Sequence, residues 1–316
     1  MFSPRSPRPA LTASAAVLAL LLTGCSQSGG ADSDGEPAIG DVPALLESRD
    51  LALPMSPYIP DDRQLGLLNE AQDVLVDQCM RRYGFRYQQR RKADSTVKRD
   101  NNRRYGLSDP AEAARYGYEN PQLVRTEKPP QQPLGPNEQL VLNGLEVDPS
   151  LPVPMSQEEA EKSDVATTAV GGQKVPAGGC GREGALKLWA PTKDTVDYMV
   201  PQNFRADGYA RSRKDSRVVK AIKSWSECMG RHGYTVDNPM DPPPGINDSN
   251  YGGPQAIAIA KQDVECKKET NLVGIWYTVE VAYQKRLIEQ NAETLDRAKK
   301  QLDERLKLAA SLIAGS

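Results

Sequence analysis

The chain has 316 residues and a formal net charge of −2, with 25 glycines, 25 prolines and only 6% aromatic residues. This composition predicts long irregular stretches beside a modest core. Beyond the first two dozen residues no segment is apolar enough to span a bilayer, which argues against a multi-span membrane protein.

Residues 1–24 have the organisation of a signal peptide. A short basic segment precedes an apolar run at residues 10–22, which would form only about 20 Å of helix against the ~30 Å core of a bilayer. The run ends in Leu22-Thr23-Gly24-Cys25, which resembles a bacterial lipobox. We therefore expect Cys25 to carry a diacylglycerol anchor at the outer face of the cell membrane, where two acyl chains hold a protein stably. An ordinary signal peptide with an incidental cysteine is the alternative.

The rest of the chain divides into three parts. Residues 25–60 begin with a Ser/Gly/Asp-rich run and are predicted to form a lipidated flexible tether. Residues 61–200 are predicted to form a first helical module, with a loop-rich insertion at residues 86–178, and residues 201–316 a second. We expect a mainly α fold built from two disulfide-linked helical modules.

Four cysteines follow Cys25, and an even number on the oxidising side of a membrane predicts two disulfides. Cys79 and Cys228 each open a C-M-x-x-x-G-[FY] motif, and Cys180 and Cys266 each open C-x-x-E. The same order twice indicates an internal duplication. It favours the pairs Cys79–Cys180 and Cys228–Cys266, while pairing across the copies stays open. A zinc site made of four distant thiolates is a further alternative, although the chain has no C-x-x-C pair.

The C-M-x-x-x-G-[FY] motif has the features of a helix end. Its glycine fits the left-handed C′ position, which places Met80 or Met229 at C3 and the aromatic residue at C″, the positions that meet in a Schellman motif. His232, the only histidine, occupies the position that Tyr83 holds in the first copy. We interpret His232 as a surface residue at a helix end rather than as a catalytic group.

Capping and periodicity predict the remaining elements. We expect a helix at 61–83 opened by an Asp61 capping box, a short helix from Asp109-Pro110 to Tyr116, one or two turns at 137–143, a loop over 146–178 and an irregular excursion over 239–254. Apolar residues at threes and fours then predict one continuous helix from Leu272 to Ile313, about 60 Å long. Its far end is free to pack back on the body, to pair with another chain or to project.

Residues 81–105 carry ten Lys/Arg against two Asp. Outside a cell the polyanions available to such a stretch are phospholipid headgroups and wall polymers rather than nucleic acid. We expect five of the basic residues to contact an anionic surface, namely Arg90, Arg91, Lys92, Lys98 and Arg99. A solvated basic loop, balanced by acids elsewhere in the fold, is the alternative.

Several segments of the chain are similar to those of a known family. They are the lipobox, the two C-M-x-x-x-G-[FY] motifs, Arg104-Tyr105-Gly106, Ala114-Arg115-Tyr116-Gly117-Tyr118 and residues 266–287. Together they resemble actinomycete surface lipoproteins of the Streptomyces type. The resemblance implies a cell-surface location, paired cysteines and an association with exporters or wall-binding components. The resemblance provides no activity that could be assigned to this chain.

These observations predict a membrane-anchored extracytoplasmic lipoprotein that acts as a non-enzymatic accessory protein of the cell envelope, with a transporter among its candidate partners. A solute-binding lipoprotein and a secreted cell-wall hydrolase are the alternatives. The chain contains no G-x-S-x-G or H-E-x-x-H motif, so we assign no catalytic residue, cofactor or metal. We interpret the carboxylate pairs Asp61/Asp62 and Glu158/Glu159 as helix starts.

Overall fold

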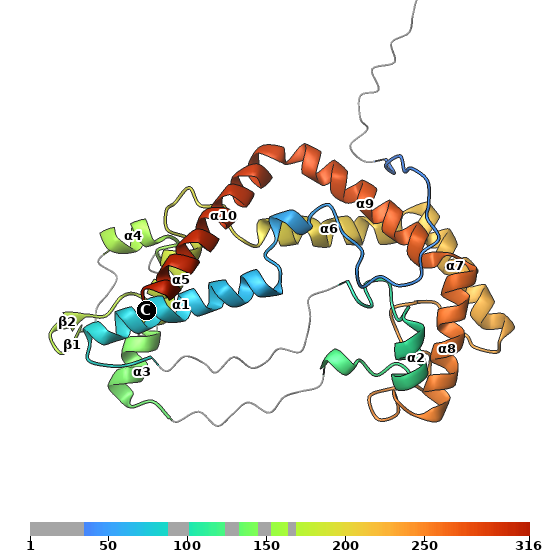
Figure 1. Ribbon diagram of the computed structural model, residues 1–316, viewed down its shortest axis with the longest axis horizontal. Coiled ribbons are helices and arrows are strands. Elements are labelled where there is room, and N and C mark those ends of the chain that lie inside the picture. Colours follow the sequence, from blue (N-terminus) through green and yellow to red (C-terminus); the bar gives the residue numbers. More distant parts are fainter. Residues whose placement is uncertain (1–34, 88–100, 124–132, 145–152, 164–168) are drawn as a thin grey trace, which may run out of the picture. The chain divides into compact units, whose positions relative to one another are not determined.

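A computed structural model gives the structure of residues 35–87, 101–123, 133–144, 153–163 and 169–316. This part of the chain is mainly helical, as predicted (Figure 1). Its α-helices are α1 Asp62–Arg82, α2 Pro110–Tyr116, α3 Pro136–Asn143, α4 Gln157–Lys162, α5 Gly179–Trp189, α6 Val200–Lys214, α7 Ser216–Arg231, α8 Pro254–Glu269, α9 Leu272–Gln290 and α10 Ala292–Ala314. Two 3-10 helices, η1 Ser56–Tyr58 and η2 Pro121–Leu123, and a two-stranded antiparallel hairpin of β1 Ala169–Val170 and β2 Gln173–Lys174 complete the described elements.

The helices that begin at strong local signals are confirmed. At the start of α1, the Gln64 amide donates to Asp61 Oδ1 at 2.7 Å, and Gln64 Oε1 accepts from the Asp61 amide at 3.0 Å. This reciprocal pair satisfies two backbone donors that a helix start leaves free. Helix α2 likewise begins after an Asp109 cap with proline at its first position. The turns predicted at 137–143 form α3 and end at Gly144.

The loop predicted over residues 146–178 is partly wrong, because it contains two short elements. Helix α4 begins at a Ser156 capping box, in which the Glu159 amide donates to Ser156 Oγ at 3.2 Å. Glu158 and Glu159 therefore lie in a helix start, as interpreted from the sequence. The hairpin β1–β2 turns at two glycines with positive φ, Gly171 and Gly172.

The single helix predicted from Leu272 to Ile313 is wrong, because the chain breaks at Asn291 between α9 and α10. Asn291 has φ −126° and ψ 25°, and its side-chain amide donates to the Leu287 carbonyl at 2.8 Å. An asparagine that bonds the preceding turn competes with the helical ladder. The apolar periodicity continues on both sides of Asn291, so the sequence pattern did not indicate a break there.

The C-terminal helix packs back on the body, which was one of three arrangements left open. Helix α10 places Leu302 and Ala309 against α1, where Leu68, Ala71 and Leu75 are buried. Helix α9 is enclosed by α6, α7 and α8, and most of its residues are buried or half-buried. Residue 200 was the predicted boundary between the two modules. Helices on either side of it pack together, since α10 contacts α1 and α8 contacts α2.

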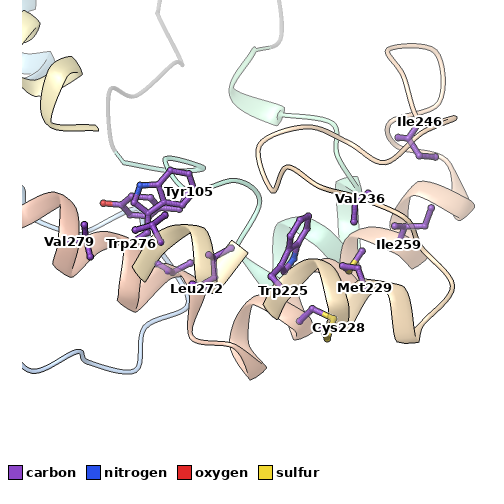
Figure 2. Close-up of a cluster of buried hydrophobic side chains, with 14 of the residues drawn as sticks. Tyr105, Trp225, Cys228, Met229, Val236, Ile246, Ile259, Leu272, Trp276 and Val279 are labelled. Atoms are coloured by element: carbon purple, nitrogen blue, oxygen red, sulfur yellow. A yellow bond between two sulfur atoms is a disulfide. The ribbon is translucent and has the colours of Figure 1, made fainter. Parts of the chain in front are cut away.

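The largest cluster of buried side chains lies among α7, α8 and α9. Figure 2 shows Trp225 and Met229 of α7 among these side chains, and Trp276 of α9 beside Tyr105. The rings of Tyr105 and Trp276 have centroids 5.4 Å apart, within the range of favourable aromatic pairs. Tyr105 belongs to the loop-rich insertion, so part of that insertion contributes to the core of the second module.

The flexible tether was predicted over residues 25–60, but its later part is docked on the helices. From Pro37 onward the chain belongs to the same compact unit as the helices. Leu53 and Met55 are buried, and the Met55 amide donates to Gln284 Oε1 on α9 at 3.0 Å. The Leu45 amide donates to Asn271 Oδ1 at 3.1 Å. Isolated apolar residues between prolines gave too weak a periodic signal to predict this docked segment.

Within the described residues, no helix combines the length and the apolar character that crossing a membrane requires.

Candidate functional site

Each disulfide joins the end of one helix to a second helix. Cys79 of α1 is bonded to Cys180 of α5, with Cα atoms 5.5 Å apart. Cys228 of α7 is bonded to Cys266 of α8, with Cα atoms 5.6 Å apart. The pairing within each copy is therefore confirmed, and pairing across the copies is wrong. Because all four sulfurs lie in disulfides, they supply no thiolates for the alternative zinc site.

Both C-M-x-x-x-G-[FY] motifs end their helices as Schellman motifs, as predicted. In the first copy the Phe85 amide donates to the Met80 carbonyl at 3.1 Å, and Gly84 has φ 79°. In the second copy the Tyr234 amide donates to the Met229 carbonyl at 3.0 Å, and Gly233 has φ 85°. This bond from C″ to C3 is the defining feature of the motif.

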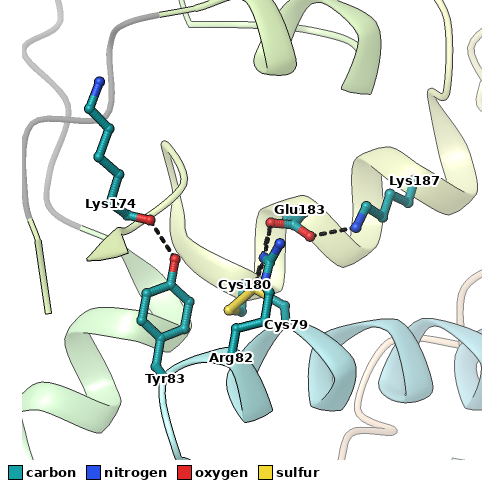
Figure 3. Close-up of a disulfide and its surroundings, with 7 residues drawn as sticks. All are labelled: Cys79, Arg82, Tyr83, Lys174, Cys180, Glu183 and Lys187. Atoms are coloured by element: carbon teal, nitrogen blue, oxygen red, sulfur yellow. Dashed lines mark hydrogen bonds and ion pairs between the residues drawn. A yellow bond between two sulfur atoms is a disulfide. The ribbon is translucent and has the colours of Figure 1, made fainter. Parts of the chain in front are cut away.

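An Arg–Glu ion pair lies next to each disulfide and was not predicted from the sequence. Arg82 pairs with Glu183 beside the first disulfide, and Arg82 also donates to Cys79 Sγ at 2.9 Å (Figure 3). Arg231 pairs with Glu269 at 2.5 Å beside the second. In both copies the arginine and the glutamate stand three residues after their cysteines, one helical turn on. The joint recurrence of C-x-x-R and C-x-x-E was the signal that could have predicted the pair.

The two ion pairs differ in their surroundings. The Glu183 side chain is 8% exposed, whereas that of Glu269 is 59% exposed. Burial alone would raise the pKa of Glu183, but hydrogen bonds from Lys187 and Arg82 outweigh it and hold this pKa below its ordinary value. The first pair is thus an integral part of its module, and the second lies at the surface.

His232 is the exposed C-cap residue of α7, as interpreted from the sequence. Its imidazole and the sulfurs of Cys228 and Cys266 lie within 4.8 Å of one another. Since the two sulfurs are bonded together, the imidazole is the only conventional ligand of the three. In the first copy Tyr83 holds the equivalent position, and its hydroxyl donates to the Lys174 carbonyl of β2 at 2.5 Å.

A buried ion-pair network centres on Glu280 of α9, which has no exposed side-chain surface. Arg104 donates to it in a bidentate manner, through Nε at 2.9 Å and Nη2 at 2.5 Å, and Tyr105 donates at 2.9 Å. Gln284 donates at 2.6 Å and links Glu280 to the docked N-terminal segment. Burial, the neighbouring Glu280 carboxylate and its hydrogen bond raise the pKa of the Tyr105 hydroxyl, which keeps it a neutral donor.

A second buried network lies on α8. Lys267 Nζ contacts Asp263 at 2.9 Å and donates to the Leu107 carbonyl at 2.8 Å. Trp225 Nε1 and the Tyr118 hydroxyl also donate to Asp263, at 2.8 and 3.3 Å. Burial raises the pKa of Asp263 and lowers that of Lys267, and their mutual attraction opposes both shifts. These contacts attach the segment that follows Arg104 to the second module.

The backbone of that segment closely approaches the loop between α7 and α8 at Gly106, which has φ 86°. A Cβ atom there would lie 2.0 Å from the Pro239 carbonyl oxygen and 2.9 Å from Lys267 Nζ. Only glycine fits such a position without displacing its neighbours. Arg104-Tyr105-Gly106 thus combines two donors for Glu280 with one close backbone approach.

These networks are saturated and enclosed, which limits their chemistry. Both oxygens of Glu280 and both oxygens of Asp263 already accept hydrogen bonds from protein groups. A general acid or base needs hydrogen-bond reach to a substrate proton, which buried carboxylates with occupied lone pairs lack. The sequence offered one signal for them, because Glu280 and Asp263 interrupt otherwise apolar helical stripes.

The other predicted site residues lie outside the residues that the structure describes. They are the lipidation residue Cys25 and the five basic residues Arg90, Arg91, Lys92, Lys98 and Arg99.

Comparison of the chain with known protein families, with curated proteins and with solved structures finds no match.

Proposed function

We propose that the protein is an extracytoplasmic lipoprotein, anchored through a diacylglycerol on Cys25, that acts as a non-enzymatic accessory protein at the outer face of the cell membrane. The observation that carries this proposal is the order of a basic segment, a short apolar run and Leu22-Thr23-Gly24-Cys25 at the start of the chain. A membrane transporter is the class of partner that we would look for first.

The two disulfides support an extracytoplasmic location. Cytosolic reductants keep most thiols reduced, whereas disulfides persist in secreted and surface proteins. The first disulfide closes a sequence separation of 101 residues and the second one of 38. In each pair one helix, α1 or α7, ends in a Schellman motif, and a cross-link of this kind stabilises a fold by constraining the unfolded chain.

The enclosed ion pairs support an interaction role over a hydrolytic one. Two buried carboxylates of the second module, Glu280 and Asp263, bind residues of the same chain. Their contacts stabilise the docked segments and leave the helices as rigid surfaces. A rigid helical body on a short anchor suits a protein that presents a surface to an envelope partner.

Cross-linking in native membranes, followed by mass spectrometry, tests this proposal. Reproducible cross-links from the body to an integral membrane protein, absent in a Cys25→Ala strain, would support it. Turnover of cell-wall fragments by the purified protein, abolished by exchange of one carboxylate, would replace it with a hydrolase. Stoichiometric binding of a small solute to the purified protein would replace it with a solute-binding lipoprotein.

A further inference from the structure

A basic surface lies where α6 ends and α7 begins. Residues 211–223 contain six Lys/Arg and a single acidic residue, Asp215. This stretch is separate from the basic residues 81–105, and all of it belongs to the described part of the chain.

The acids nearby neutralise only part of this surface. Arg211 is paired with Asp207 at 2.9 Å, and Arg217 is paired with the buried Asp215 at 2.6 Å. The basic side chains that remain toward solvent are Arg213, Lys214, Lys220 and Lys223. Lys223 is 77% exposed and lies 3.9 Å from Glu227, a distance at which an exposed pair contributes little.

An apolar side chain stands among these cations. Val219 is 52% exposed, which is high for a valine on a helix that otherwise buries its apolar face. A surface that mixes several cations with an exposed apolar side chain suits the headgroup region of a bilayer, which offers anionic phosphates above acyl chains. We name Arg213, Lys214, Lys220 and Lys223, together with Val219, the α6–α7 basic face.

The N-terminal segment of the body is docked beside this face. The Pro37 carbonyl accepts a hydrogen bond from Arg217 Nη2 at 2.9 Å. A few residues on, the Pro43 carbonyl accepts from Asn271 at the start of α9. The path of the chain from Cys25 therefore arrives at the body next to the α6–α7 basic face.

The length of chain before Pro37 limits how far the anchor can lie from this face. Pro37 follows Cys25 by 12 positions, and a chain spans at most about 3.6 Å per residue, so the two residues are no more than roughly 40 Å apart. An acyl chain on Cys25 would thus hold the face within a short distance of the bilayer. At such an effective concentration, contacts that are weak in free solution are populated.

We propose that the α6–α7 basic face docks on anionic phospholipid headgroups of the membrane that holds Cys25. The inference rests on the proposed lipid anchor and adds an orientation to it. Each Lys/Arg near an anionic surface strengthens binding about fivefold, so four of them outweigh the two exposed acids closest to Pro37 in the sequence, Glu36 and Asp41. The attraction acts within a Debye length, about 10 Å at 0.1 M salt.

Lysine acetylation of the full, acylated chain in reconstituted vesicles tests the proposal. One vesicle set contains phosphatidylcholine alone, and the other contains 30% phosphatidylglycerol. We expect Lys214, Lys220 and Lys223 to react at least threefold more slowly in the anionic vesicles and to recover in 1 M salt, where the Debye length is about 3 Å. The exposed Lys299, Lys300 and Lys307 on α10 serve as internal controls and should react equally in both sets.

A pair of charge-matched variants sharpens the test. In Arg213→Gln/Lys214→Gln/Lys220→Gln the protection of Lys223 should be lost, whereas Lys299→Gln/Lys300→Gln/Lys307→Gln should retain it. All six positions are exposed, so the helical circular dichroism should stay unchanged in both variants.

The mass of the Cys25 peptide, measured in the same samples, separates this inference from the proposed function. An acylated Cys25 with equal acetylation of all lysines would overturn the basic face and leave the lipoprotein in place. An unmodified Cys25 would overturn the lipoprotein, and slower acetylation of the face on added anionic vesicles would still support the docking surface. Protection by isolated wall polymer but not by anionic vesicles would overturn headgroup docking.

Discussion

Arg104 and Glu280 lie 176 positions apart in the sequence and form a bidentate ion pair in which the glutamate is fully buried. The guanidinium also lies 4.9 Å from the centroid of the Tyr209 ring on α6. This one contact therefore connects the loop-rich insertion of the first module to two helices of the second. Burial lowers the pKa of Arg104, but the hydrogen bond and charge of Glu280 outweigh it and raise this pKa.

Replacing Arg104 by alanine should strongly destabilise the protein. Removal of one partner leaves the Glu280 charge buried and uncompensated, which costs about 3–5 kcal/mol in the free energy of unfolding. Urea unfolding followed by circular dichroism measures the loss. As a control, Lys162→Ala removes an exposed pair with Glu158 and should leave the midpoint unchanged. Equal midpoints for the two variants would contradict the central position of the Arg104–Glu280 pair.

Gly106→Ala and Gly66→Ala should have opposite effects on stability. At Gly106 the positive φ and the nearby Pro239 carbonyl make a Cβ atom costly, and we expect a loss of roughly 3 kcal/mol. Gly66 lies inside α1 with no atom within 4 Å of a Cβ, so alanine there should stabilise by about 0.5–1 kcal/mol. Thermal unfolding of both variants checks the prediction, which fails if Gly106→Ala is neutral.

Each disulfide should contribute several kcal/mol, with the first contributing slightly more. Loop-entropy arguments give about 4.7 kcal/mol for the separation of 101 residues and about 3.9 kcal/mol for that of 38. Double serine variants of each pair, compared by urea unfolding, measure both contributions. Peptide mapping without reductant should recover only Cys79–Cys180 and Cys228–Cys266. A peptide that links one copy to the other would contradict the structure.

The ion pair at the first disulfide should make stability depend on pH in the acid range. Because the pKa of Glu183 is lowered by folding, its contribution is complete above the ordinary pKa of about 4.3 and is lost as the pH falls through the folded value. Glu183→Gln should therefore differ from the unaltered protein at pH 7 and converge with it below that window. The exposed counterpart Glu269→Gln is the matched control and should show a smaller difference at pH 7.

Local signals in the sequence predicted the fold better than they predicted the assembly of its parts. The Asp61 capping box and the Gly84 and Gly233 helix ends depend on residues a few positions apart, and each formed as expected. The break at Asn291 was not predicted, because one side chain interrupts the helix while the apolar pattern continues on both sides. The docking of Arg104 on Glu280 joins distant segments, for which a single sequence carries no periodic signal.

The same distinction applies to the candidate site. Matching frames favoured the two observed disulfides, because the duplication matched the cysteines by position, but they left pairing across the copies open. The Arg82–Glu183 and Arg231–Glu269 pairs follow the same frames and were within reach of the same argument. Nothing in the spacing of Lys267 indicated that it would bind the Leu107 carbonyl, because that contact depends on the path of a loop.

The intact mass of the N-terminal peptide, isolated from the membrane fraction of cells that make this protein, tests the central claim most directly. For a lipid-anchored protein we expect the N-terminal peptide to begin at Cys25 and to carry a diacylglycerol. In the Cys25→Ala variant we expect the chain to retain residues 1–24. An unmodified Cys25, or a mature chain that begins at another residue, would contradict the account.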